Sequence, residues 1–387
     1  MKNKKNNTML SLVSLVKRNV TLYLKDKGMV FFSFLAPVIV LMLYILFLGD
    51  MQVDAIRAML QQPEYAGVNL SDTQISAIIN NWMIAGVMAV SCITVSFNAN
   101  TIMVRDRERG NINDVLASPV KRWVVYASYV LSCFIITLCI CLAVLVIALI
   151  YLACTGGFMM NFAELLAILG ITVLSILSAS LMTVLMIGFI KSEGALSAIC
   201  GVFSAAIGFL IGAYIPASML PETVQNISGF IPGTYSAGLF RNYFLSGPVR
   251  VLSDQVPPEV IQNLLNQYSI DLNFFGMKVS AGWMVGAILI SILIFAVLMV
   301  IFYSNKKTNF FSMTKKKKKK KIKKAKVVKT TKTATNEPSK VELNVGEKAG
   351  EKQSSQSEEP ESEAKTTETV EEAKSEPNKK TEGSQQN

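Results

Sequence analysis

Histidine is absent from the 387 residues. Without imidazole the chain lacks the usual general base at neutral pH, the commonest zinc ligand and the triads built on histidine. The sequence also has no G-x-x-x-x-G-K-[ST] motif, so it does not hold ATP through a P-loop. These absences argue against an enzyme, and they predict no cofactor and no metal site.

Charge is scarce as well, because only 17% of the residues are charged while 51% are hydrophobic. A helix that crosses the hydrocarbon core needs about 20 apolar residues. Six runs meet this requirement and have no Lys, Arg, Asp or Glu in the middle: 29–48, 82–104, 124–152, 162–190, 195–214 and 279–303. Proton-coupled pumps normally carry an ionisable residue inside the membrane, so the pattern argues against one; sodium coupling through carbonyls and hydroxyls stays open.

The distribution of positive charge predicts the orientation. The first run lacks a small-residue cleavage pattern in LYILFLGDMQ, so it is a span and no signal peptide. Lys and Arg gather before the first span, between the second and third, and after the sixth. Cytoplasmic loops retain positive charge, so we expect a multi-pass protein of the plasma membrane with both termini in the cytoplasm.

The net charge of +11 suggests a nucleic-acid binder at first sight. The excess lies beside the spans, however, where orientation and attraction to anionic membrane lipid explain it, so we expect no nucleic-acid partner. The six cysteines fall within or at the edges of the spans without a pairing pattern. We interpret them as packing residues.

The chain divides into three parts: a cytoplasmic N-terminus at 1–28, a six-span domain at 29–303 and a Lys-rich, then Glu/Lys-rich, tail at 304–387. Within 8–28 apolar residues recur at helical spacing between basic ones, namely Leu12, Leu15, Val16 and Leu22. This favours an amphipathic helix on the inner membrane surface, or equally a basic lead-in that only anchors the first span. The tail is too poor in apolar residues to offset the entropy of ordering, so we expect disorder.

A short charged segment, RDRERGNINDVLASPVKR, interrupts the apolar sequence at 105–122. Asn111 is a candidate N-cap for a short helix, and Pro119 prevents that helix from continuing. Ile112, Val115 and Leu116 share one face of that helix. A helix of two turns is unstable alone, so it docks into the groove of a cytoplasmic partner or lies on the headgroups.

The outer segments are of two kinds. Residues 49–81 form a small polar excursion with one helix expected around 71–80. Residues 215–278 contain short apolar pieces between Pro and Gly, too brief to cross the bilayer. Short helices that dip into the outer leaflet under cover of protein fit this pattern, and a loop resting on the headgroups is the alternative.

Three stretches resemble the membrane subunit of an ABC-2 type transporter: LVKRNVTLYLKDKGMVFFSFLAPVIVLMLY at 15–44, VRDRERGNINDVLASPVKRW at 104–123 and GAYIPASMLPETVQNISGFIPGTYSAGLFRNYF at 212–244. The resemblance implies an all-α membrane protein with six spans, an interfacial helix, a cytoplasmic coupling helix and re-entrant outer helices. It also implies a second permease copy, identical or paralogous, and a separate cytoplasmic ABC ATPase subunit. The tail goes beyond the family pattern.

The resemblance assigns roles to residues of this sequence. Contact with the ATPase would involve the coupling set Asp106, Glu108, Gly110, Ile112, Val115, Leu116 and Pro119, with Asp106 standing where Glu is usual. The outer gate would involve Tyr214, Pro216, Pro221 and Pro232.

Two Gly-x-x-x-Gly pairs, Gly208 with Gly212 and Gly282 with Gly286, permit close helix contact. For Gly208 and Gly212 we expect dimer packing, with packing inside one subunit as the alternative. Asn98 and Asn100 either touch cargo or bond a neighbouring helix.

The expected function is therefore that of the permease subunit of an ATP-driven exporter of an amphiphilic small molecule, peptide or lipid. Export of a lipid-linked glycan is an alternative within the same machinery. A scaffold acting through its charged tail is an alternative of another class, and deletion of 304–387 would separate it from a permease.

Overall fold

The computed structural model describes residues 2–65, 68, 70–268, 272–274 and 277–304. Almost all of them are helical, and six helical segments are long and apolar enough to cross a membrane. These are Lys27–Leu60, Asp72–Arg109, Arg122–Cys154, Phe162–Ile187, Glu193–Leu210 and Ala281–Phe302. The predicted six-span helical fold is confirmed. The lysine run and the tail predicted to be disordered lie outside the described residues.

The first span is longer than the apolar run predicted. Helix α1 (Lys2–Lys25) ends just before Asp26, whose carboxylate accepts the N–H of Met29 and caps α2 (Lys27–Leu43). A π-helical turn, η1 (Tyr44–Leu48), then leads into α3 (Gly49–Leu60), and the 3₁₀ turn η2 (Pro63–Tyr65) follows. Residues 49–60 therefore continue the first span instead of forming a separate outer excursion.

Helix α4 (Asp72–Ala99) lies at the centre of the bundle and packs against α2, α7, α8, α9 and α11. It begins ten residues earlier than the predicted second span, because Ser71 and Gln74 form a reciprocal capping box there. The helix expected around 71–80 is its first part. Nearly every residue from Ile75 to Ala99 is buried in the protein.

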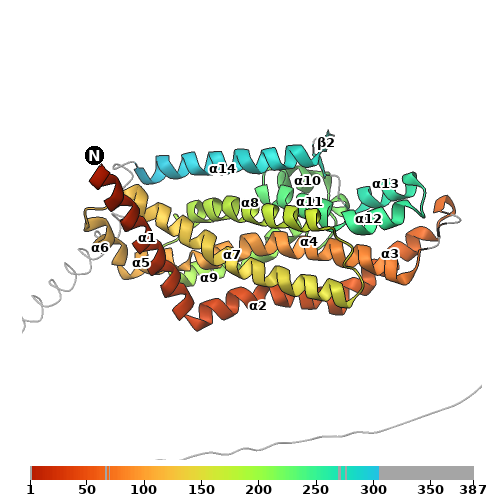
Figure 1. Ribbon diagram of the computed structural model, residues 1–387, viewed down its shortest axis with the longest axis horizontal. Helices are drawn as coiled ribbons and strands as arrows, with labels where there is room; N and C mark the ends of the chain where they lie inside the picture. The colour runs from red at the N-terminus through yellow and green to blue at the C-terminus, as the bar shows by residue number, and fades with distance from the viewer. Residues whose placement is uncertain (1, 66–67, 69, 269–271, 275–276, 305–387) are drawn as a thin grey trace, which may run out of the picture. The chain divides into compact units, whose positions relative to one another are not determined.

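Four further spans complete the bundle, and all but the last of them pack against α4. They are α7 (Arg122–Cys154), α8 (Phe162–Ile187), α9 (Glu193–Leu210) and α14 (Ala281–Ser304). Figure 1 shows α14 along one side of the bundle and α2 along the other, with α4, α7 and α8 between them. The same view places α1, α5 and α6 at one end and α3, α12 and α13 at the opposite end.

The segment after α9 folds into short helices, as predicted. They are η3 (Ala217–Met219), α10 (Glu222–Ser228), α11 (Pro232–Phe244), α12 (Ser246–Ser253) and α13 (Pro258–Gln267), followed by the hairpin β1 (Leu272–Phe274) and β2 (Met277–Val279). Pro216, Pro221 and Pro232 stand at the start of η3, α10 and α11. Proline suits these places because a helix start needs no N–H. Helix α11 is mostly buried against α4, α8 and α14.

Candidate functional site

The charged segment forms two short helices joined at a tight corner. Helix α5 (Thr101–Arg109) ends at Gly110, whose φ of 87° is left-handed and therefore favours glycine, and α6 (Asn111–Ala117) follows at once. The prediction that Asn111 caps α6 was wrong. Gly110 occupies the cap position, and the Asn111 side chain turns back to donate to Asp106.

Asp106 joins three elements through its buried carboxylate. Arg18 of α1 donates to both carboxylate oxygens, at 2.7 and 2.8 Å, and the Tyr129 hydroxyl of α7 donates at 2.7 Å. The Asn111 amide supplies a further bond of 3.2 Å. A two-point Arg–carboxylate pair is strong and directional, and it raises the pKa of Arg18. Helix α5 is thus fastened to α1 and α7.

Arg105 makes an equivalent connection in another direction. Its guanidinium lies 2.9 Å from the Asp26 carboxylate, which caps α2, and 2.9 Å from Glu193, which begins α9. Arg105 and the Met29 N–H hold the pKa of the Asp26 carboxyl below its usual value. Glu108 accepts the Glu193 N–H at 2.8 Å, adding a second link to the start of α9.

Arg107 reaches the end of α8. One guanidinium nitrogen donates to the carbonyl oxygens of Ile187, Gly188 and Ile190, at 3.1, 2.9 and 2.5 Å. The last carbonyls of a helix lack partners within it and carry partial negative charge, so a cation there is favourable. Four consecutive charged residues therefore bind side chains of α1 and α7 and the ends of α2, α8 and α9, and we call residues 105–108 the charged hub.

Helix α6 presents a polar face to the outside. Ile112 is 1% exposed, and Val115 and Leu116 pack partly against the core of this chain. The predicted apolar docking face is therefore largely used within the subunit. Asn113 and Asp114 are exposed and form the face that is open to a partner. Pro119 is exposed beyond the end of α6.

Helix α1 likewise turns its predicted apolar face inward, since Leu12, Leu15 and Val16 are partly or fully buried and α1 packs along α7. The side chains that stay exposed and apolar are Met9, Leu10, Val13, Leu22 and Leu24. The residues predicted to meet lipid, Leu22 apart, meet protein instead. This second set forms the exposed apolar face of α1.

At the opposite end, the turn after α9 is held by its backbone carbonyls. The Tyr44 hydroxyl donates to the carbonyl oxygens of Ala213 and Tyr214, at 2.7 and 3.1 Å, and Arg241 of α11 donates to that of Gly212. Gly86 of α4 lies against the same turn, because a Cβ at residue 86 would be 2.7 Å from the Ala213 oxygen. The first span, α4 and α11 meet at this turn, which we call the outer clamp (residues 212–214).

Arg241 is a fully buried cation that the sequence reasoning missed, because it lies in the short helix α11 and in no apolar run. Its guanidinium carbon is 5.4 Å from the centroid of the Trp82 ring, within cation–π range. Trp82 also makes an edge contact with Tyr268 and donates to the Tyr268 carbonyl at 2.9 Å. Aromatic faces and the carbonyl at the end of α9 replace water around the charge.

The four residues predicted for the gate differ in their burial. Tyr214 is in the clamp, Pro216 is buried beside it and Pro232 is buried at the start of α11, whereas Pro221 is exposed. The Tyr214 ring occupies the space where a Cβ at Gly208 would lie, and Gly212 adopts a φ of 70° close to Ala217. Both glycines are therefore used for close packing within this chain. Their contact with a second copy stays a prediction.

The Tyr44→Phe variant isolates the clamp's hydroxyl. We expect the free energy of unfolding to fall by about 1 kcal/mol, since one hydrogen bond is lost and two carbonyls keep their other contacts. Tyr243→Phe is the matched control, because no hydrogen bond of the Tyr243 hydroxyl is found in the described part of the chain. Equal unfolding midpoints in urea for both variants would contradict the assignment.

A cavity of about 120 Å³ lies between α2, α4 and α9, just below the outer clamp. Its lining is mostly small and apolar, with Ser91, Thr94, Ser204 and Tyr214 as the polar members. Asn100 does not reach this space, because it bonds Thr183 of α8 at 2.8 Å and the carbonyl of Ser96 at 3.0 Å. Asn98 is half-buried.

The family model of the ABC-2 type transporter matches residues 11–245, which is more than half of the chain. The chain belongs to the ABC-2 type transporter family. It is therefore the permease component of an ABC transporter, a multi-pass membrane protein that associates with an ABC ATPase subunit. The comparison with curated proteins returns no significant match.

Within this permease, the matched region contains the charged hub, the cavity and the outer clamp. Sequence reasoning assigned Asp106 and Glu108 to contact with the ATPase, which stays a prediction, and did not foresee their partners within this chain. Arg18 and Asp26 were read only as part of a basic N-terminus, although opposite charges near helix ends were the available signal. Tyr129 and Tyr44 carried no signal, because a tyrosine in an apolar run is as often a packing residue as a hydrogen-bond donor.

Proposed function

We propose that this chain is the permease of an ATP-driven exporter in the plasma membrane, working as two copies with two separate ATPase subunits. Its termini are cytoplasmic, so α1, α5 and α6 face the ATPase and the outer clamp faces the exterior. The observation that carries the proposal is the charged hub. Motion delivered to α5 and α6 has rigid, charge-assisted connections to five other helices.

The coupling step begins at the exposed side of α6. Ile112 anchors α6 to its own chain, so the ATPase contacts the polar face around Asn113 and Asp114. A displaced α6 moves α5 through Gly110, and Arg105, Asp106 and Arg107 transmit the displacement to their partner helices. Each link is a charged hydrogen bond between 2.5 and 3.2 Å, which resists sliding more than apolar contact does.

The pathway lies along α2, α4 and α9, where the cavity below the outer clamp is found. Ser91 already donates to the Val87 carbonyl, so the wall offers cargo an apolar surface with few polar contacts. Such a wall suits an amphiphilic small molecule, peptide or lipid. The clamp closes the outer end, and separation of α11 from residues 212–214 opens it.

The exposed face of α6 is tested by Asp114→Lys in the complex of this chain with its ATPase, reconstituted in nanodiscs. We expect retention of the ATPase to fall about tenfold, because charge complementarity sets encounter and register at such an interface. ATP hydrolysis by the complex should fall in parallel.

Asp254→Lys is the control for this charge reversal, since Asp254 is also an exposed aspartate but follows α12 at the opposite end. It should leave both the retained ATPase and the hydrolysis rate unchanged. If Asp114→Lys behaves like Asp254→Lys, α6 is not the docking element and the coupling route is wrong.

A further inference from the structure

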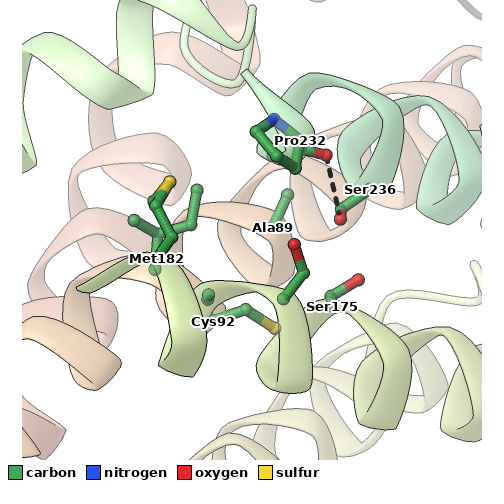
Figure 2. Close-up of a pocket in the computed structure, with 10 residues that line it drawn as sticks. Ala89, Cys92, Ser175, Met182, Pro232 and Ser236 are labelled. Carbon is green, nitrogen blue, oxygen red and sulfur yellow. Dashed lines mark hydrogen bonds between the residues drawn. The ribbon is translucent and has the colours of Figure 1, made fainter. Parts of the chain in front are cut away.

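A second, very small cavity lies where α4, α8 and the start of α11 meet. Its volume is about 10 Å³, close to the ~10 to 15 Å³ needed for the centre of one water molecule. Figure 2 shows that Ser175 of α8 lies across the hollow from Pro232 and Ser236 of α11, with Cys92 of α4 beside it. The cavity is separate from the space below the outer clamp.

Ser175 aims a buried hydroxyl at this cavity. The residue is 3% exposed, and its Oγ has no hydrogen-bond partner within the described part of the chain. Its neighbour Ser178 is already paired with Ser291 of α14, at 2.9 Å. A buried hydroxyl without a partner is unfavourable, above all in a membrane protein whose surroundings offer no substitute.

The other side of the cavity supplies complementary groups. Among the described residues, Ser236 makes only a long hydrogen bond, 3.4 Å, to the Pro232 carbonyl, which is the dashed line in Figure 2. Its oxygen therefore retains capacity to accept. Gly233 also lines the cavity and lies in the first turn of α11, where backbone N–H groups have no acceptor within the helix. The positive end of the helix dipole points the same way.

We propose that one water molecule occupies this cavity and joins Ser175 of α8 to the N-terminal turn of α11. The water accepts from α11 and bridges the two serine hydroxyls, which satisfies the groups that no side chain reaches. A bridging water is nearly as good as a direct bond and exchanges its partners easily. Helix α11 can therefore shift against α8 without losing a fixed side-chain bond, a property that holds whatever the cargo.

Radiolytic footprinting of the full chain in nanodiscs tests the site directly. X-rays convert bound water to hydroxyl radicals, which oxidise side chains in contact with that water. Cys92 lines the cavity and Cys133 does not, although both are free cysteines and 1% exposed, so they form a matched pair of reporters. We expect Cys92 to be oxidised at least fivefold faster than Cys133, and equal rates would overturn the proposal.

The Ser175→Ala variant provides a second test, because its thermal midpoint should change in opposite directions for a cavity with a bound water and for a dry one. With a bound water, the variant loses the bridge, so the thermal midpoint falls and Cys92 oxidation slows to the rate of Cys133. In a dry cavity, the variant removes an unpaired hydroxyl, so the midpoint rises. An unchanged or higher midpoint would count against the water.

Ser128→Ala is the control for this substitution. Ser128 is equally buried, but its hydroxyl donates to the Val125 carbonyl of its own helix at 2.7 Å. Its replacement should leave the oxidation rate of Cys92 unchanged. Neither readout depends on the ATPase partner, so their failure leaves the proposed transport function untouched.

Discussion

Replacing Asp106 by Ala is expected to lower the free energy of unfolding by about 3 kcal/mol, because it removes one member of a largely buried ion pair. The Asp106 side chain is 4% exposed and accepts bonds from Arg18, Tyr129 and Asn111. Arg18 is 32% exposed and regains some water in the variant, which keeps the loss at the lower end of the range for buried pairs. Urea unfolding of the purified permease in micelles measures the change.

The same substitution should abolish the increase in ATP hydrolysis that the permease causes in its ATPase subunit, since α1 and α7 are no longer fastened to α5. Asp106→Glu keeps the charge and should retain most of both properties. Asp54→Ala is the control for a surface pair: Asp54 is 71% exposed beside Arg57, and such pairs contribute about 0 to 1 kcal/mol. A loss at Asp106 no greater than at Asp54 would mean that the hub is not a structural junction.

Replacing Gly86 by Val should be the most damaging change at the outer end. The new Cβ would lie 2.7 Å from the Ala213 oxygen and 3.2 Å from its Cα, and both are backbone atoms that cannot rotate away. Overpacking of this kind typically costs about 1 to 3 kcal/mol and sometimes more, so we expect a loss of about 3 kcal/mol and disruption of the outer clamp. The thermal midpoint of the purified permease reports it.

Gly170→Val on α8 is the matched control, because a Cβ there meets nothing within 4 Å. It replaces glycine by valine in the middle of an apolar helix without a clash, and should leave the midpoint within a few degrees of the parent. Should Gly86→Val be tolerated as well as Gly170→Val, α4 and the outer clamp are not in the close contact described.

The second span begins earlier than the hydropathy of the sequence predicted. Asn80 and Asn81 interrupt the apolar run, so the span was predicted to begin at residue 82. In the structure both amides are buried. The Asn81 NH₂ group donates to the Gly157 carbonyl at 2.9 Å, and the Asn80 oxygen accepts from the Tyr151 hydroxyl at 3.2 Å. Polar residues are permitted in a buried helix once neighbours satisfy them, and those neighbours cannot be read from the run itself.

For the short helix α6, the local sequence predicted the helix itself and its apolar face, but not the direction in which that face points. Its length, its end before Pro119 and the shared face of Ile112, Val115 and Leu116 follow from residues within one turn of each other. Its orientation does not, because an apolar face packs equally well on a partner or on its own chain. The structure turns that face inward and leaves the polar side around Asp114 exposed.

The sequence by itself determined the class of protein, the number of spans and the family, because hydrophobic length and local motifs are properties of contiguous residues. Only the tertiary structure decided which groups the charges and hydroxyls contact. Arg18 and Asp106 are 88 positions apart, and Tyr44 and Ala213 are 169 apart. In a low-dielectric interior the partner of each polar group is set by the packing of whole helices, and no local pattern contains that information.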